Sequence, residues 1–258
     1  MVVVIEFRIP MPMTVSEYQI GQLYSIAEMS KESSGKNGEG VEIIANEPFQ
    51  KGDEKGQFTS KIYHIGKSLP KIMSSFLPSG ALNVHEEAWN AYPYCKTSIN
   101  APFLGDKFSA TILSMYKDDD GTCPNALNLS KEHLAKRKII KLDIVNDEFP
   151  TKKKENDPSI HKCTKRDIGP LTGKLWEKNQ PTIMWCYKVC IMECKIWGLQ
   201  NAIEAKFVEV ECEVFLKLHR KIYCSMDDWI DMDMNAITEM EKNTAKQLEQ
   251  INKGKGFS

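Results

Sequence analysis

The sequence lacks any long run of apolar residues. No window approaches the roughly 18 uncharged apolar residues of a membrane-spanning helix. The first apolar run, MVVVI, is interrupted by Glu6 and Arg8, and no basic segment precedes it. This pattern predicts a strand rather than a signal peptide. We therefore expect a cytoplasmic protein without a membrane span.

The sequence also lacks an excess of charge of either sign. The formal net charge is −1 at pH 7, which argues against a nucleic-acid binder with a basic surface, so no nucleic-acid partner is expected. The chain has 258 residues, of which 41% are hydrophobic and 27% charged. These are ordinary globular values, enough for one large domain or two small ones.

Standard catalytic motifs are missing. The segment His85-Glu86-Glu87-Ala88-Trp89 begins like a zinc-protease motif but has no second histidine at the required position. There is no G-x-S-x-G segment, and Gly35, Gly38 and Gly40 match no phosphate-binding loop. No residue stands out as a nucleophile, so the expectation is a protein that is not an enzyme and that needs no metal or cofactor.

The chain has eight cysteines. Without a secretory signal they are expected to be free thiols rather than a disulfide framework. Cys186, Cys190 and Cys194 are four residues apart, unlike the two-residue spacers of structural zinc sites. They share one face of a strand, which favours small core residues over metal ligands.

Local patterns predict a mixed α and β chain. Thr14 and Glu17 fit a capping box, and Met13 with Tyr18 has the spacing of a hydrophobic staple, so a helix is expected over residues 15–30. Strands at 41–46 and 57–65 flank the turn-rich KGDEKG and predict a hairpin. Further strands are predicted at 91–99, 108–116, 138–144 and 182–195.

Two segments fit neither pattern. Residues 68–84 are apolar but interrupted by Pro70, Pro78 and Gly80, too broken for a regular element and too apolar for an ordinary loop. Residues 149–173 are charged and contain prolines, which predicts a surface excursion of low core potential within one domain.

The C-terminal third is predicted to be helical. A first helix, over 200–225, has a core-facing stripe of six residues, Ile203, Phe207, Val210, Val214, Leu218 and Ile222. A second begins near Asp233, a good N-cap residue, and its stripe is Met234, Ile237, Glu241, Thr244, Leu248 and Ile251.

Glu241 therefore occupies a position at which the helical spacing predicts a buried apolar residue. A buried unpaired carboxylate costs several kcal/mol, so it needs a cation, a polar ligand or water. One interpretation is a slight rotation of the helix that packs Met240 and leaves Glu241 at the edge. The other is a ligand or lysine partner, with Thr59, Lys61 and Asn90 as candidate neighbours.

Several segments together resemble the small soluble phosphatidylinositol transfer proteins. They are SEYQIGQLYSIAEMSKESSG, GEGVEIIANEPF, EKGQFTSKIYHI, PSGALNVHEEAWNAYPYCKT, the WGLQN run from Trp197 and the final MEKNTAKQLEQI. The resemblance extends almost from end to end and weakens between about 118 and 180. It implies a single α+β lipid-binding domain over 1–258 with a START-like helix-grip fold, in which a curved, mainly antiparallel sheet and long helices enclose one phospholipid.

The resemblance also implies site residues. The inositol headgroup contacts carry over onto Thr59, Lys61, Asn90, Lys188 and Glu241. The phosphatidylcholine and cavity contacts carry over onto Gln22, Glu86, Cys95, Thr97, Ser114 and Leu218. Ser114 replaces a threonine of the family and keeps the hydroxyl, whereas Leu218 replaces a phenylalanine and removes an aromatic face.

Membrane handling and regulation follow from the same resemblance. Residues 68–84 correspond to the lipid-exchange loop, and 118–180 to a surface or regulatory loop region. Ile196-Trp197 stands where the family has two tryptophans for membrane docking, so part of an interfacial anchor is lost. Cys163 replaces a kinase-target serine, and the neighbouring Thr164 is the candidate phosphorylation site in its place.

The function implied is that of an intracellular carrier. It would exchange one phosphatidylinositol or phosphatidylcholine between membranes, support phosphoinositide synthesis, touch membranes peripherally, and act as a monomer that supplies phosphoinositide kinases. Two other classes stay open. They are a lipid-sensing module that binds phosphatidylinositol without bulk transfer, and an enzyme that acts on the enclosed lipid.

Overall fold

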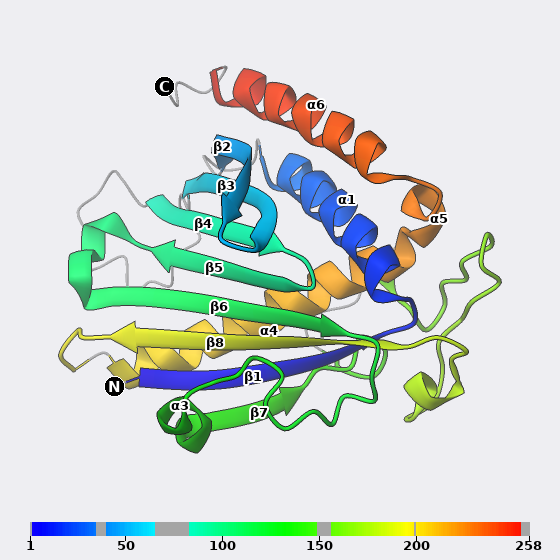
Figure 1. Ribbon diagram of the computed structural model, residues 1–258, viewed down its shortest axis with the longest axis horizontal. Coiled ribbons are helices and arrows are strands. Elements are labelled where there is room, and N and C mark those ends of the chain that lie inside the picture. Colours follow the sequence, from blue (N-terminus) through cyan, green and yellow to red (C-terminus); the bar gives the residue numbers. More distant parts are fainter. Residues whose placement is uncertain (1, 35–39, 65–82, 149–155, 199, 254–258) are drawn as a thin grey trace.

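The computed structural model describes residues 2–34, 40–64, 83–148, 156–198 and 200–253 (Figure 1). Within these residues eight strands form one sheet in the order β2-β3-β4-β5-β6-β8-β1-β7. The strands are β1 Val2–Met11, β2 Gly40–Lys51, β3 Glu54–His64, β4 Asn83–Ala91, β5 Tyr94–Asn100, β6 Phe108–Lys117, β7 Arg137–Lys141 and β8 Met184–Cys194. All neighbours are antiparallel except β1 and β7, which are parallel.

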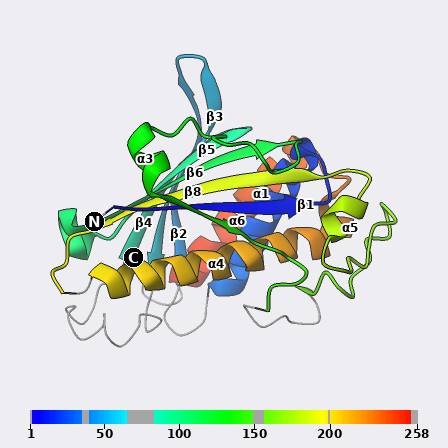
Figure 2. The same ribbon diagram turned by 90° about the horizontal axis from the view of Figure 1, so that it is seen from below.

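Helices cover one face of this sheet. They are α1 Val15–Ser33, α4 Gln200–Cys224, α5 Met226–Trp229 and α6 Met234–Lys253, while α3 Lys131–Lys136 and the 3-10 turns η1 Pro102–Lys107 and η3 Trp176–Asn179 are short. Figure 2 shows α4 running along the sheet. Helix α1 packs beside α4, and α6 lies beside α1 and over β2 (Figure 1). The predicted α+β helix-grip architecture is confirmed.

The main core lies between the sheet and these helices. Phe7 of β1 and Phe215 of α4 meet edge to face, with ring centroids 5.2 Å apart. Tyr18 of α1, Ile222 of α4 and Trp229 of α5 are completely buried in the same cluster. The cluster fixes α4 and α1 against the β1–β8 half of the sheet, where the apolar side chains are concentrated.

A buried charge cluster holds the outer face of β1. The Glu6 carboxylate accepts hydrogen bonds from Arg8 Nε and Arg137 Nη1, each at 2.6 Å. The two guanidinium groups also donate to the backbone carbonyls of Gly121, Cys123 and Pro124. Both oxygens of the buried Glu6 carboxylate are thus hydrogen-bonded. The same two arginines hold the segment 121–124 against β1 and β7.

The predicted starts of two helices are confirmed. Thr14 N donates to Glu17 Oε2 at 2.9 Å and Glu17 N donates to Thr14 Oγ1 at 3.2 Å, which completes the capping box of α1. Asp233 Oδ1 accepts from Ala236 N at 2.8 Å at the start of α6. Met13 and Tyr18, the predicted staple, are both buried in the main cluster.

Several strand boundaries differ from the prediction. The β2–β3 hairpin extends to a tight turn at Gly52-Asp53, so most of KGDEKG is strand. The predicted strand 91–99 is wrong at its start, because β4 ends at Ala91 and β5 begins at Tyr94. Strand β7 ends at Lys141, and Leu142 and Ile144 are buried beyond it. Residues 68–82 of the predicted exchange loop lie outside the described residues.

The charged stretch 149–173 has more core than its composition predicts. From residue 156 onward it contributes Cys163 and Leu171, both buried in the main cluster. Low average hydropathy hid these positions, because Cys163 lies in the charged segment HKCTKR and Leu171 lies between Gly169-Pro170 and Thr172-Gly173.

One carboxylate holds this stretch to α5. Asp227 accepts four hydrogen bonds of 2.9 Å from Cys163 Sγ, Thr164 N, Thr164 Oγ1 and Lys165 N. These donors, Cys163 first, hold the pKa of Asp227 far below its usual range. The loop is therefore anchored by charge-assisted hydrogen bonds made only when Asp227 is ionised.

We expect Asp227→Asn to lower the free energy of unfolding at pH 7 by about 1 to 3 kcal/mol, since hydrogen bonds to a charged group are lost. Because folding depresses the pKa of Asp227, its contribution is present above the unfolded value of about 3.9 and is lost as pH falls below it. Urea unfolding at pH 7 and at decreasing acidic pH measures both effects. Asp228→Asn, on the exposed neighbour, is the control, and an equal loss in both variants would contradict the anchor.

Candidate functional site

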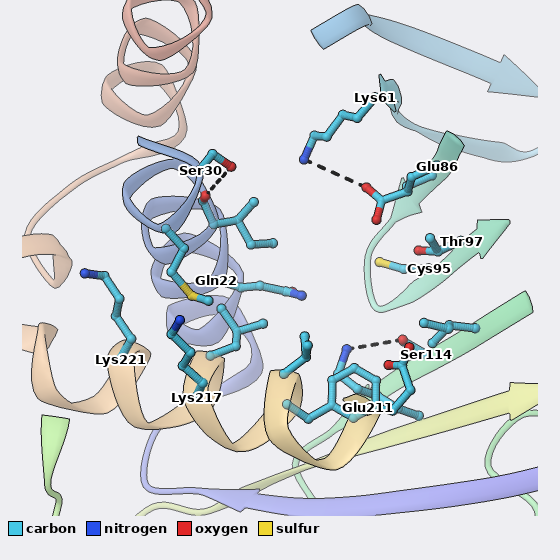
Figure 3. A pocket seen from close by; sticks show the side chains of 18 of the residues that line it. Gln22, Ser30, Lys61, Glu86, Cys95, Thr97, Ser114, Glu211, Lys217 and Lys221 are labelled. Carbon is cyan, nitrogen blue, oxygen red and sulfur yellow. Dashed lines mark hydrogen bonds and ion pairs between the residues drawn. The ribbon is translucent and has the colours of Figure 1, made fainter. Parts of the chain in front are cut away.

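A cavity of about 1190 Å³ lies between the sheet and helices α1 and α4 (Figure 3). Strands β2 to β6 and β8 supply one wall, and α1 and α4 supply the other. The volume exceeds the roughly 300–1000 Å³ typical of pockets for small drug-sized ligands. The lining mixes apolar side chains with hydroxyl, amide, carboxylate and ammonium groups, so the cavity can take a large amphipathic ligand.

The sheet register explains why polar groups converge on this wall. Side chains directly opposite each other on paired strands point to the same face. One row across the sheet is Asn90, Cys95, Ser114 and Lys188, and a parallel row contains Thr59, Ala88, Thr97 and Ile112. A third row pairs Lys61 with Glu86 and Ile99. All of these residues line the cavity.

The WNAYPYCKT segment is a hairpin rather than one strand. Asn90 pairs with Cys95 across the turn formed by Tyr92 and Pro93. Two residues of opposite parity in the sequence therefore face the same cavity. Gly56 lies so close to this hairpin that a Cβ there would stand 2.1 Å from the Asn90 carbonyl oxygen, so only glycine fits.

Lys188 carries a buried ammonium group in the middle of the wall. Its side chain is 4% exposed, and Nζ donates to Ser114 Oγ at 3.3 Å and to Tyr116 OH at 3.1 Å. The ammonium also lies 5.2 Å and 5.3 Å from the ring centroids of Tyr116 and Phe215. All these partners are neutral, so the site favours an anion that reaches Lys188 through the cavity.

Gln22 reaches the cavity from α1. The Tyr92 hydroxyl donates to Gln22 Oε1, and the Tyr92 ring stacks on Tyr116 with centroids 5.0 Å apart. Figure 3 shows the amide nitrogen of Gln22 pointing into the cavity. The amide is thus oriented to donate to an oxygen of a ligand near Lys188.

A second polar group lies on β3 and β4. The Tyr63 hydroxyl donates to Glu86 Oε1 at 3.2 Å, and Lys61 Nζ is 4.0 Å from the same oxygen. Figure 3 shows Lys61 and Glu86 on a different part of the wall from Ser114. Donors and acceptors alternate here, as recognition of a polyhydroxyl group requires.

Glu241 is half-buried at the β2–β3 edge rather than among the lining side chains. Burial raises the pKa of Glu241, while a hydrogen bond with Asn46 and the charge of Lys61 act in the opposite direction. The hydrogen-bond partner of Glu241 is therefore the Asn46 side chain. The Oδ1 atom of Asn46 accepts a separate hydrogen bond from Gln57 Nε2 at 2.6 Å.

The structure brings ten of the eleven residues carried over from the family into the cavity wall, and Glu241 is the exception. The ten are Gln22, Thr59, Lys61, Glu86, Asn90, Cys95, Thr97, Ser114, Lys188 and Leu218. Sequence reasoning missed Tyr63, Tyr116 and Glu211, which also line the cavity. The two tyrosines stand two residues after Lys61 and Ser114 and share their faces, a signal that strand alternation could have given.

Glu211 was missed because the predicted stripe of α4 is partly wrong. Val210 and Val214 belong to that stripe but are 39% and 44% exposed. Glu211 is 8% exposed, four residues before the buried Phe215. Ile203, Leu218 and Ile222 of the predicted stripe are buried, so the stripe is correct at its two ends and wrong in its middle.

The predicted docking and phosphorylation residues lie outside the cavity. Ile196 and Trp197 follow β8, and Trp197 is 93% exposed. Thr164 is exposed on the loop anchored by Asp227. Among the described residues, no group of three or more His, Cys, Asp or Glu side chains could hold a metal ion, and no helix is long and apolar enough to cross a membrane.

A family model and individual relatives point to the same protein family. Residues 2–246 match the family model described as phosphatidylinositol transfer protein. The chain is 45% identical over 251 residues to phosphatidylinositol transfer protein 5 of Dictyostelium discoideum, covering 96% of this chain and 86% of that protein. It is 40% identical over 261 residues to the human phosphatidylinositol transfer protein beta isoform, covering 98% and 96%.

The environment of Cys95 predicts slow thiol chemistry. Burial raises the pKa of Cys95 to about 12, although the Lys188 charge lowers it. Since the thiolate is the reactive form, we expect Cys95 to react with iodoacetamide at pH 8 at least about tenfold more slowly than the partly exposed Cys123. Peptide mass spectrometry of a time course measures both rates, and equal rates would show that the cavity wall is open to water at Cys95.

Proposed function

This chain belongs to the phosphatidylinositol transfer protein family, and we propose that it carries one phosphatidylinositol or phosphatidylcholine molecule at a time between membranes. The observation that carries the proposal is the large cavity in which cross-strand rows place Lys188, Ser114, Asn90 and Cys95 on one wall. We propose a carrier without a catalytic step and without a cofactor, the phospholipid being its cargo.

The physical need for such a cavity follows from the lipid. A phospholipid has roughly 30 methylenes, each worth about 0.8 kcal/mol when removed from water, so desorption into water costs more than about 20 kcal/mol. A carrier must offer the chains an apolar environment comparable with the bilayer. Side chains such as Ile26, Met29, Ile99, Ile112 and Val214 line this cavity and can supply it.

We assign the headgroup end from the polar wall. The lipid phosphate would accept from Lys188, Ser114, Thr97 and the Gln22 amide. The inositol hydroxyls would meet the groups of β3 and β4, namely Thr59, Lys61, Glu86 and Asn90. Glu241, which lies beside Asn46 at the edge, would complete this site from α6. A choline headgroup would lie near Cys95 and Leu218.

Membrane contact is proposed for the turn after β8. A tryptophan placed at an interface buries its ring while its N–H stays hydrated. Trp197 is almost fully exposed, and Ile196 precedes it. We propose a monomeric protein of the cytoplasm that touches membranes peripherally through this turn and delivers phosphatidylinositol to phosphoinositide kinases.

Phosphorylation of Thr164 is proposed as a regulatory event. The Thr164 hydroxyl donates to Asp227, and a phosphate there would turn a donor into an acceptor facing a carboxylate. The nearby cations Lys162, Lys165 and Arg166 are already paired with Asp167, Asp231 and Glu17. Phosphorylation would therefore loosen the anchored loop rather than dock it.

A two-vesicle transfer assay tests the function. We expect the protein to move both labelled lipids from donor to acceptor vesicles. Lys61→Ala and Glu241→Gln should lower phosphatidylinositol transfer at least about tenfold and phosphatidylcholine transfer little, because the inositol ring loses hydrogen bonds that a choline group does not make.

The outcomes separate the alternatives. Binding of phosphatidylinositol without transfer would replace the carrier by a lipid-sensing module. Chemical change of the bound lipid, followed by mass spectrometry, would indicate an enzyme. Equal loss for both lipids in the two variants would contradict the headgroup assignment, and Lys55→Ala on the exposed end of β3 is the matched control.

Trp197→Ala tests the docking turn. We expect weaker association with vesicles and slower transfer, with bound lipid retained, because the exposed ring is remote from the cavity wall. Sedimentation with vesicles measures association, and mass spectrometry measures the retained lipid. Unchanged association would place docking elsewhere on the protein.

A further inference from the structure

Glu211 is an unusual carboxylate within the cavity. Its side chain is buried from bulk solvent and lines the cavity from α4. Among the residues that the structure describes, none hydrogen-bonds to it and none pairs with it within 4.0 Å. Glu86, another carboxylate of this cavity, already accepts from Tyr63 and lies near Lys61. Glu211 therefore has free acceptor capacity that faces the ligand space.

Within the described part of the chain, the titratable groups that interact with Glu211 by charge come from three elements. Lys188 and Cys190 lie on β8, Glu86 on β4 and Cys212 on α4 itself. The Lys188 ammonium directs its hydrogen bonds to Ser114 and Tyr116, so it influences Glu211 by charge alone. Figure 3 shows Glu211 and Ser114 at the same end of the view, away from Lys61 and Glu86.

We propose that Glu211 is a specificity-determining residue whose charge decides whether the cavity takes a choline lipid or an anionic inositol lipid. The inference rests on the proposed function and deepens it. The ionised carboxylate would be the counter-ion of the quaternary ammonium of phosphatidylcholine, and the neutral acid would accommodate phosphatidylinositol.

The chemistry of the two headgroups supports this assignment. A quaternary ammonium carries charge but has no N–H to donate, so it suits a carboxylate that has no other hydrogen-bond donors around it. With the lipid phosphate beside Lys188, each charge of phosphatidylcholine then has one opposite charge. Phosphatidylinositol brings the same phosphate but no cation, so an ionised Glu211 would be left with an uncompensated charge in a dry cavity. The neutral acid avoids that cost and can donate a hydrogen bond to a ligand oxygen.

The charge of Glu211 changes in the physiological range. Burial raises the pKa of Glu211 to about 7, with Lys188 lowering it and Glu86 raising it. Phosphatidylinositol binds the protonated form better and so raises this pKa further, whereas phosphatidylcholine lowers it. By linkage, lowering the pH shifts binding toward phosphatidylinositol, and raising the pH shifts it toward phosphatidylcholine.

The test measures bound lipid rather than transfer. The full chain is equilibrated at pH 6, 7 and 8 with vesicles of equal phosphatidylinositol and phosphatidylcholine content, re-isolated, and its lipid quantified by mass spectrometry. We expect the bound ratio of phosphatidylinositol to phosphatidylcholine to fall about sixfold from pH 6 to pH 8, which corresponds to a difference of about one pKa unit, centred near pH 7, between the two loaded states.

Three variants complete the design. Glu211→Gln is neutral at all pH values, so its ratio should stay high and independent of pH. Glu211→Asp retains a carboxyl group and should retain the pH dependence. Glu209→Gln removes an exposed carboxylate of the same helix that pairs only with Lys206 among the described residues, and it should behave like the unmodified chain.

The outcomes are distinct. A ratio that does not change with pH in the unmodified chain overturns the inference while leaving the carrier function intact. Persistence of the pH dependence in Glu211→Gln assigns it to another group and also overturns the inference. If no variant and no unmodified protein binds either lipid, both the inference and the proposed function are wrong.

Discussion

The organisation of the cavity depends on one buried ammonium group. Burying a lysine costs several kcal/mol unless neighbouring groups or a counter-ion compensate. Here Lys188 has two hydroxyl acceptors and two aromatic faces, which hold the ammonium in place without neutralising it. The remaining compensation has to come from an anion, and the route to Lys188 is the cavity. A lipid phosphate would meet this requirement, and the apolar lining beside it would hold the chains.

Lys188 faces the cavity beside Ser114, Cys95 and Asn90 because of the register of four paired strands. Such pairing between distant segments could not be predicted from local sequence patterns, whereas features within one helical turn could. Local signals were sufficient for the starts of α1 and α6, because a capping box and an N-cap involve residues within one turn. Asn90 and Cys95 are different. Read as one strand, they point to opposite faces, and only the pairing of β4 with β5 across Tyr92-Pro93 brings them together. Family resemblance, not spacing, placed them in one site.

Helix α4 shows a second limit of sequence patterns. Periodicity assumes that the side facing the sheet is a dry core, so apolar residues mark it. In a protein that encloses an amphipathic ligand, part of that side faces a cavity instead. Val214 can then line the cavity while 44% exposed, and Glu211 can be buried in the same wall, so apolar spacing alone does not reveal the polar residue of the functional face. The same reasoning was more successful on α6, which packs on α1 and β2. Ile237, Thr244 and Leu248 of its stripe are buried, and Met234 at its start is 44% exposed.

Three carboxylates near the cavity differ in their surroundings. Glu241 is hydrogen-bonded to the Asn46 amide, and Glu86 accepts from the Tyr63 hydroxyl and lies near the Lys61 ammonium. Within the described residues, Glu211 has no hydrogen-bond donor and no ion-pair partner within 4.0 Å. If the polar groups of the empty cavity were all hydrogen-bonded to one another, those bonds would have to break before a lipid could bind. Among the described residues, Lys188 has no ion pair within 4.0 Å and Glu211 has no hydrogen-bond donor, which makes the empty state costly. Such a cavity would favour replacement of one lipid by another over release into water.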